Sequence, residues 1–144
     1  MRRCWMVALL AVAASAGVLA ASAGAGKGPF APEDCTRAEA RPERITISCA
    51  DDGIFVDSIN WSNWGGQQSS GTGILHVNKC KPSCVAGNFK EYPVNLAVTK
   101  PKPRKCGTKK RVKLYRIMYL NFPQNQPSQN IVSAVSKSKM FCNG

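Results

Sequence analysis

The spacing of its cysteines is the feature that most limits how this 144-residue chain can fold. Cys4 lies in a leader, "MRRCWMVALLAVAASAGVLAASAGAG", in which two arginines precede an apolar run and then small residues. This is the pattern of a secretory signal peptide. We expect residues 1–23 to be removed, with cleavage after Ala23 or Ala25, and the mature protein to be secreted with no transmembrane span. Six cysteines remain after the leader, and they are Cys35, Cys49, Cys80, Cys84, Cys106 and Cys142.

An even number of cysteines in an exported chain predicts three disulfides. A zinc site at Cys80 and Cys84 would need further soft ligands, but the only histidine is His76. A redox dithiol normally has two residues between its cysteines, whereas three intervene here. We therefore predict no metal and no other cofactor. Fifteen pairings are formally open, and we predict 35–49, 80–84 and 106–142.

The hydrophobic pattern after the leader is typical of a single β-rich domain. Residues 24–43 are rich in proline and charge and are predicted to form an irregular N-terminal arm, followed by the domain itself at 44–144. Tyr92, Val94, Leu96 and Val98 alternate along one predicted strand. In residues 54–61, Phe55, Ile59 and Trp61 are predicted to lie together, and residues 112–122 are long enough for one strand across a sheet.

At least five such strands, separated by turn-forming residues, favour an all-β fold. We predict a small disulfide-stapled β-sandwich, immunoglobulin-like or similar, with a basic loop rich in proline and lysine. The pattern of residues 129–141 fits either a short helix or a last strand.

Four short motifs resemble a known group of proteins. They are Cys49-Ala50-Asp51, the segment Trp61 to Gly65, the segment Asn78 to Gly87, and Tyr92-Pro93-Val94. The region from 45 to 98 is similar to a family of small secreted actinobacterial proteins that has no established activity. The resemblance implies a secreted, β-rich domain and assigns no catalytic residue.

No catalytic constellation is recognisable in the sequence, and we predict that the protein is not an enzyme. His76 lies between Leu75 and Val77 in a predicted strand, where a structural or surface role is the commoner one. The stretch 51–53, Asp-Asp-Gly, is typical of a turn between two strands. Trp61 is expected in the core, whereas Trp64 precedes two glycines and is the candidate for an exposed aromatic that stacks on sugar rings.

Charge is distributed unevenly along the chain, which has a net charge of +12. All eight acidic residues precede residue 92. The stretch "KPKPRKCGTKKRVKLYR" concentrates nine cations, namely Lys100, Lys102, Arg104, Lys105, Lys109, Lys110, Arg111, Lys113 and Arg116. Such a segment creates a positive potential over one end of a domain.

We therefore predict a partner among extracellular polyanions: envelope phosphates, acidic glycans, anionic lipid or nucleic acid, the last without reading of base sequence. The alternatives are a solvated segment that only aids solubility and, for the whole protein, a disulfide-stapled inhibitor or effector that presents a rigid loop to a protein target.

Overall fold

The computed structural model describes residues 28–143, and antiparallel β-structure dominates them. The predicted signal peptide, residues 1–23, lies outside the described residues, as do residues 24–27 of the predicted arm. The prediction of a small, disulfide-stapled all-β fold is confirmed. Within the described residues, no helix is long and apolar enough to cross a membrane.

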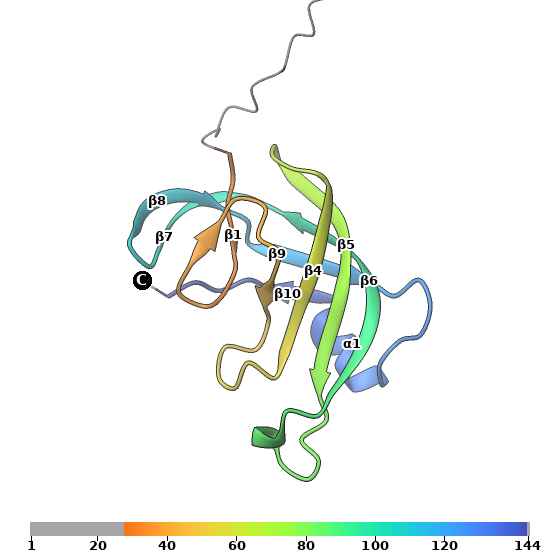
Figure 1. The fold of residues 1–144 in the computed structure, drawn as a ribbon. Helices are drawn as coiled ribbons and strands as arrows, with labels where there is room; N and C mark the ends of the chain where they lie inside the picture. The colour runs from red at the N-terminus through yellow and green to blue at the C-terminus, as the bar shows by residue number, and fades with distance from the viewer. Residues whose placement is uncertain (1–27, 144) are drawn as a thin grey trace, which may run out of the picture.

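One six-stranded sheet forms the body of the molecule, with strand order β10-β9-β6-β5-β4-β3 (Figure 1). Its strands are β3 (Ile45–Thr46), β4 (Ile54–Asn63), β5 (Gln68–Asn78), β6 (Phe89–Thr99), β9 (Ile117–Asn121) and β10 (Lys137–Lys139). Two small ribbons accompany it, β1 (Ala31–Pro32) with β2 (Ala38–Glu39), and β7 (Lys102–Cys106) with β8 (Lys109–Leu114). A 3₁₀ turn, η1 (Cys84–Ala86), and one helix, α1 (Gln129–Val135), complete the fold.

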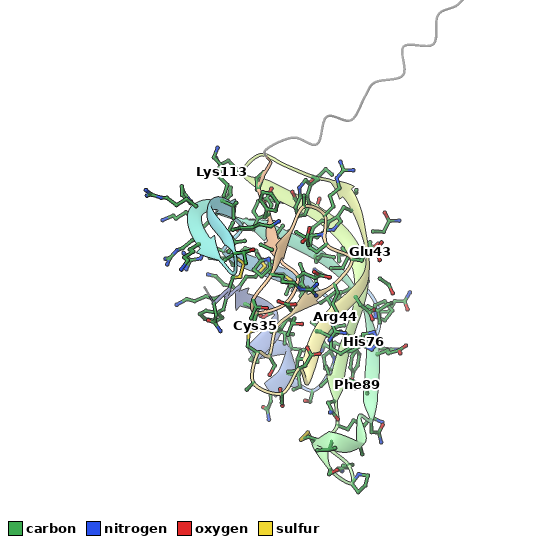
Figure 2. All side chains as sticks on the ribbon, turned by 60° about the vertical axis from the view of Figure 1, so that its left-hand side comes forward. Cys35, Glu43, Arg44, His76, Phe89 and Lys113 are labelled. Atoms are coloured by element: carbon green, nitrogen blue, oxygen red, sulfur yellow. A yellow bond between two sulfur atoms is a disulfide. The ribbon has the colours of Figure 1, made fainter. Side chains whose placement is uncertain are left out.

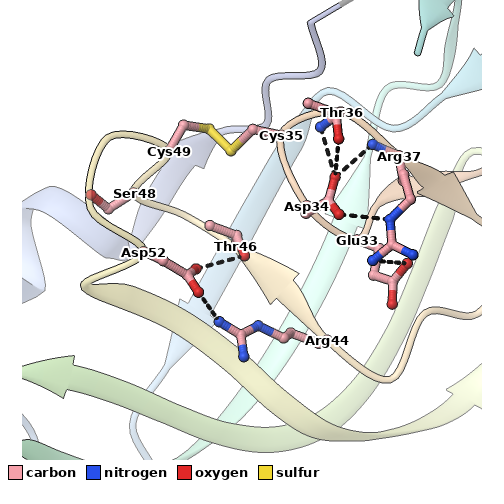
Figure 3. Close-up of a pocket in the computed structure, with 10 residues that line it drawn as sticks. All are labelled: Glu33, Asp34, Cys35, Thr36, Arg37, Arg44, Thr46, Ser48, Cys49 and Asp52. Atoms are coloured by element: carbon pink, nitrogen blue, oxygen red, sulfur yellow. Dashed lines mark hydrogen bonds and ion pairs between the residues drawn. A yellow bond between two sulfur atoms is a disulfide. The ribbon is translucent and has the colours of Figure 1, made fainter. Parts of the chain in front are cut away.

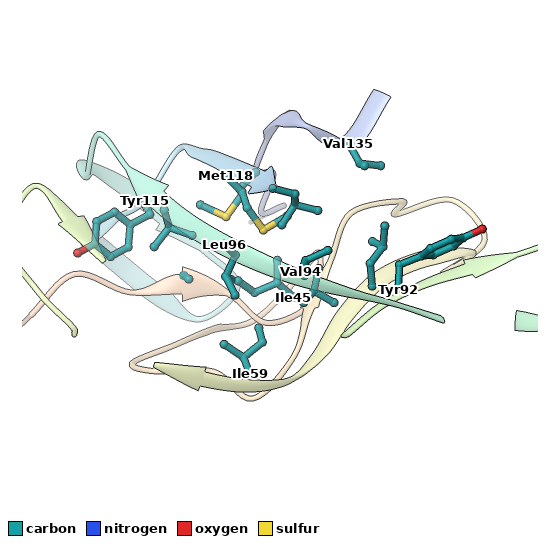
Figure 4. Close-up of a cluster of buried hydrophobic side chains, with 14 residues drawn as sticks. Ile45, Ile59, Tyr92, Val94, Leu96, Tyr115, Met118 and Val135 are labelled. Atoms are coloured by element: carbon teal, nitrogen blue, oxygen red, sulfur yellow. The ribbon is translucent and has the colours of Figure 1, made fainter. Parts of the chain in front are cut away.

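The hydrophobic core lies on one face of this sheet. The predicted alternation along β6 is confirmed, because Tyr92, Val94, Leu96 and Val98 are all buried. Strand periodicity places these side chains on the same face. The opposing layer is assembled from pieces of β1, α1 and the segment around Tyr115, instead of a second sheet of equal size (Figure 4).

A bulge in β4 changes which of its side chains enter the core. The pairing with β5 shifts between Asp57 and Asn60, and Ser58 has a positive φ of 51°. Ile59 joins the core, but Phe55 lies on the other face and stacks on His76 with ring centroids 4.6 Å apart. The prediction that Phe55 and Ile59 lie together was wrong, because one extra residue reverses the alternation.

The predicted long strand at 112–122 is in fact two strands. β8 ends at Leu114, and β9 begins at Ile117 in a different sheet. The intervening Tyr115 is fully buried, and its hydroxyl lies 2.7 Å from the Oγ of Ser69, which is also fully buried. This buried contact fixes the point at which the chain leaves one sheet for the other.

The predicted irregular arm is integrated into the domain as far as it is described. Its strands β1 and β2 bury Ala31 and Ala38. Phe30 forms a parallel bridge to Leu114, and the amide of Thr46 donates to the carbonyl of Glu33 at 3.0 Å. The C-terminal stretch that fitted either a helix or a strand contains both, α1 followed by β10.

All three predicted disulfides are confirmed. Cys35 pairs with Cys49, Cys80 with Cys84, and Cys106 with Cys142. Residues 51–53, predicted to form a turn, lie in the longer connection 47–53 between the antiparallel strands β3 and β4, whose turn residues are 49–51.

Replacing Tyr115 with Phe should lower the free energy of unfolding by about 1–2 kcal/mol, because the buried hydroxyl of Ser69 loses a partner. Urea denaturation of the disulfide-intact protein measures this change. Tyr119→Phe is the matched control: that side chain is partly exposed, so its loss should stay within about 0.5 kcal/mol. Equal losses in the two variants would contradict the role assigned to the buried contact.

Candidate functional site

The basic segment is a β-hairpin, and the prediction of a loop was wrong in this respect. β7 carries Lys102, Arg104 and Lys105, and β8 carries Lys109, Lys110, Arg111 and Lys113. Lys100 and Arg116 flank the ribbon. Alternation of Val112 and Leu114 explains the strand, since Leu114 is buried against Ala38 and Cys106.

Pairing across the hairpin distributes its cations over both faces. Arg104 lies opposite Val112, on the face of Leu114, whereas Lys113 lies opposite Pro103 on the other face. A register shift follows between Arg104 and Cys106. Figure 2 shows the side chains of β7 and β8 fanning outward from the ribbon. The hairpin is therefore a projecting ribbon with cations on both faces, and not a single flat patch.

The turn of the hairpin is anchored at its tip. Cys106 is buried in its disulfide with Cys142, and the amide of Gly107 donates to the carbonyl of Asn143 at 3.0 Å. The amide of Asn143 in turn donates to the carbonyl of Cys35 at 2.7 Å. Three segments that are distant in sequence thus meet under the basic residues and hold them in place.

Gly107 is required where these segments meet. It has a positive φ of 53°, and a Cβ built on it would collide with the carbonyl oxygen of Thr36. A side chain at this position therefore faces both an unfavourable backbone conformation and a steric clash.

Those cations of the hairpin whose side chains the structure describes form no ion pair with a carboxylate. The ion pairs of the described residues join Arg37 to Glu33 and Asp34, Arg44 to Asp52, and His76 to Asp57 and Glu91. None of them includes a residue of the stretch 100–116. Glu39 lines a cavity together with Lys109, but no ion pair of the described chain reduces the positive potential of the hairpin.

Three of the paired carboxylates, Glu33, Asp34 and Asp52, lie in a separate acidic corner beside the Cys35–Cys49 disulfide (Figure 3). This corner encloses an open pocket of about 430 Å³. Oδ1 of Asp34 accepts hydrogen bonds from the amides of Thr36 and Arg37 at 2.7 and 2.6 Å, and Asp52 accepts from Thr46 and Arg44. Because these carboxylate oxygens accept hydrogen bonds from neighbouring residues of the same corner, they hold the loop that contains Cys35 in place. The hairpin is anchored to this loop through Asn143.

These contacts change the acidity of Asp34. Partial desolvation alone would raise the pKa of this carboxyl group. The hydrogen bonds from Arg37 and Thr36 together outweigh desolvation and hold the pKa well below its usual range.

Three cations converge at a small pocket beside the hairpin. Arg104, Lys105 and Arg116 line a cavity of about 70 Å³ together with Phe141, whose side chain is 59% exposed. The sequence indicated the cations but not their convergence, and it did not indicate Phe141. The pairing of Cys106 with Cys142 and the hydrogen bond from the amide of Met140 to the carbonyl of Arg116, at 2.9 Å, bring the C-terminal segment to this position.

Two other residues singled out from the sequence, Trp64 and His76, do not line the pocket of Arg104, Lys105 and Arg116. Trp64, the candidate for a free surface aromatic, is half-buried and packs edge-on against Trp61 and Tyr115, with centroids 4.5 and 5.5 Å apart. Its position against the core corrects the prediction of an open stacking platform. His76 lies with Nε2 3.0 Å from Asp57 and Nδ1 3.7 Å from Glu91.

Comparison with protein-family models, with curated proteins and with solved structures found no match to this chain.

Replacing Gly107 with Ala should destabilise the fold by about 2 kcal/mol or more. The added methyl group would collide with the carbonyl oxygen of Thr36, and alanine would also have to adopt the positive φ of Gly107. Gly66→Ala is the control: its φ is also positive, at 67°, but nothing lies within 4 Å of an added Cβ. Thermal unfolding measures both variants. Equal losses would show that the close approach to Thr36 contributes nothing.

The Asp34 interactions should give a pH-dependent share of stability. Folding lowers the pKa of Asp34. The stabilisation from Asp34 is therefore complete above the pKa of the unfolded chain, about 3.9, and is lost as the pH falls toward the lower pKa of the folded protein. The difference in unfolding free energy between wild type and Asp34→Ala should therefore shrink below about pH 4. Denaturation curves across that range test it, and a difference that stays constant down to about pH 2 would refute it.

Proposed function

We propose that the mature protein is a secreted, non-catalytic protein that binds extracellular polyanions through the β7–β8 hairpin. The polyanions are polymers that carry repeated phosphate or acidic-sugar groups, such as envelope phosphates and acidic glycans, with anionic lipid and nucleic acid as further sources of the same charge. The observation that carries this proposal is a tethered hairpin whose described cations have no carboxylate partner.

The anchoring of the hairpin supports binding over mere solubility. Cations on a loose tail must be ordered when a ligand binds, whereas the Cys106–Cys142 disulfide and the Gly107 hydrogen bond already hold this ribbon. Exposure on both faces suits a flexible polymer that can wrap around the hairpin. Contacts of this kind position phosphate groups without reading base sequence.

Secretion is supported by the leader and by the three disulfides, which persist in oxidising compartments. The non-catalytic role is supported by the surroundings of His76, since both of its ring nitrogens face carboxylates and it stacks on Phe55. A histidine held in this way acts as a structural cross-link between strands β4, β5 and β6.

A second candidate function, an inhibitor or effector that acts on a protein, is favoured by one observation. The loop 79–88 is exposed throughout and stapled by Cys80–Cys84, and it presents Val85 with 98% of its surface exposed. Such an interface would depend on Val85 and would lose little affinity as salt rises.

The test of the leading proposal is the binding of inorganic polyphosphate and heparin at about 50 and about 200 mM salt. The variant carries Ser in place of Lys105, Lys109, Lys110 and Arg111. Its affinity at low salt should fall at least about tenfold, and the slope of log affinity against log salt should decrease by about three to four. A control with Arg41, Lys137 and Lys139 replaced by Ser loses three charges from exposed positions outside the hairpin, and the loss of affinity per removed charge is compared. Equal losses per removed charge in the two variants would refute a hairpin-specific site.

A further inference from the structure

A second cationic surface lies around a groove between the loop 79–88 and the start of α1. In Figure 1 this loop projects at the bottom of the molecule, well away from the β7–β8 hairpin. The groove has a volume of about 560 Å³, within the range of small-molecule sites. It is separate from the surface that carries the proposed polyanion function.

The floor of the groove is apolar. Tyr92 and Pro127 are buried at its base, and Val77 and Ile131 are half-buried at its sides. Val77, Tyr92 and Ile131 also belong to the hydrophobic core or pack against it, so the floor is part of the rigid body of the domain. An apolar ligand body placed there would remove both its own surface and this floor from water.

The rim of the groove is cationic. Lys79, Lys81 and Lys90 all line it and are exposed, and the described lining residues include no carboxylate. None of the three lysines takes part in an ion pair of the described chain. The Nζ of Lys90 lies 5.2 Å from the centroid of the Tyr92 ring, so this ammonium group stands directly over the apolar floor.

The backbone that carries two of these lysines is fixed in advance. Lys79 and Lys81 flank Cys80, which is joined to Cys84. The side chain of Asn78 donates to the carbonyl of Cys84 at 2.8 Å and accepts from the amide of Cys80 at 3.0 Å. A ligand therefore has only the lysine side chains left to order, which lowers the entropic cost of binding.

We propose that this groove binds a small anionic amphiphile: a molecule with an aliphatic or aromatic body and a single carboxylate, sulfonate or phosphate head. The body covers the floor of Tyr92, Val77 and Ile131, and the head lies among the three ammonium groups of the rim. Neither a bare anion nor an uncharged apolar molecule satisfies both parts of the groove.

Two fluorescent probes with the same ring system test this assignment. Anilinonaphthalene sulfonate carries the anionic head, and phenylnaphthylamine lacks it. The folded protein should bind the sulfonate at least about tenfold more tightly than the uncharged probe, as expected for a charged group held by several cations. Competition by dodecanoate and by dodecyl phosphate then distinguishes a carboxylate head from a phosphate head, and displacement by either supports the proposal.

Variants locate the site. Replacing Lys79, Lys81 and Lys90 with Ser should abolish the preference for the sulfonate probe, and Ile131→Asp should weaken binding of both probes. The hairpin variant at Lys105, Lys109, Lys110 and Arg111 should bind the sulfonate like the wild type, so the result is independent of the polyanion proposal. Equal binding of the two probes by the wild type, or full retention of the sulfonate by the triple lysine variant, would overturn the assignment.

Discussion

The backbone bridge between Phe30 and Leu114 is the contact on which both the core and the basic hairpin depend. A six-stranded sheet must cover its apolar face, and the seven-residue helix α1 covers only part of it. The amide of Phe30 donates to the carbonyl of Lys113, and the amide of Tyr115 donates to the carbonyl of Phe30, at 2.7 and 2.9 Å. These bonds bring β1 and Tyr115 over the sheet and at the same time fix the base of the hairpin.

The same arrangement separates charge within one small domain. Carboxylates of the acidic corner are used by Arg37, Arg44 and neighbouring hydroxyl and amide groups, which stabilises the loop of Cys35. The described side chains of the hairpin cations form no ion pair, although the mutual repulsion of these cations opposes folding. The Cys106–Cys142 disulfide and the bonds at Gly107 hold these like charges together. Because the fold holds these like charges together against their repulsion, an anionic partner that relieves the repulsion is expected to bind there.

Local rules predicted those features that depend on short stretches of chain. The alternation of Tyr92 to Val98 identified the central strand, because a half-buried strand has a period of two. They failed at Phe55, where a bulge at Ser58 reverses the alternation, and at Tyr115, where the chain passes between sheets. They also failed for Trp64, since Tyr115, one of the two aromatic residues that it packs against, comes from a distant part of the chain.

The sequence by itself determined the number of disulfides, the β-rich class and the unbalanced charge, because each follows from residue type and spacing alone. Only the tertiary structure decided that seven of the nine cations lie on an anchored hairpin, that Arg116 and Phe141 lie beside Arg104, and that three lysines surround an apolar groove. Convergence of this kind depends on which strands pair and on where the chain crosses between sheets. Those choices are made by the burial of apolar surface over the whole domain, which no local pattern contains.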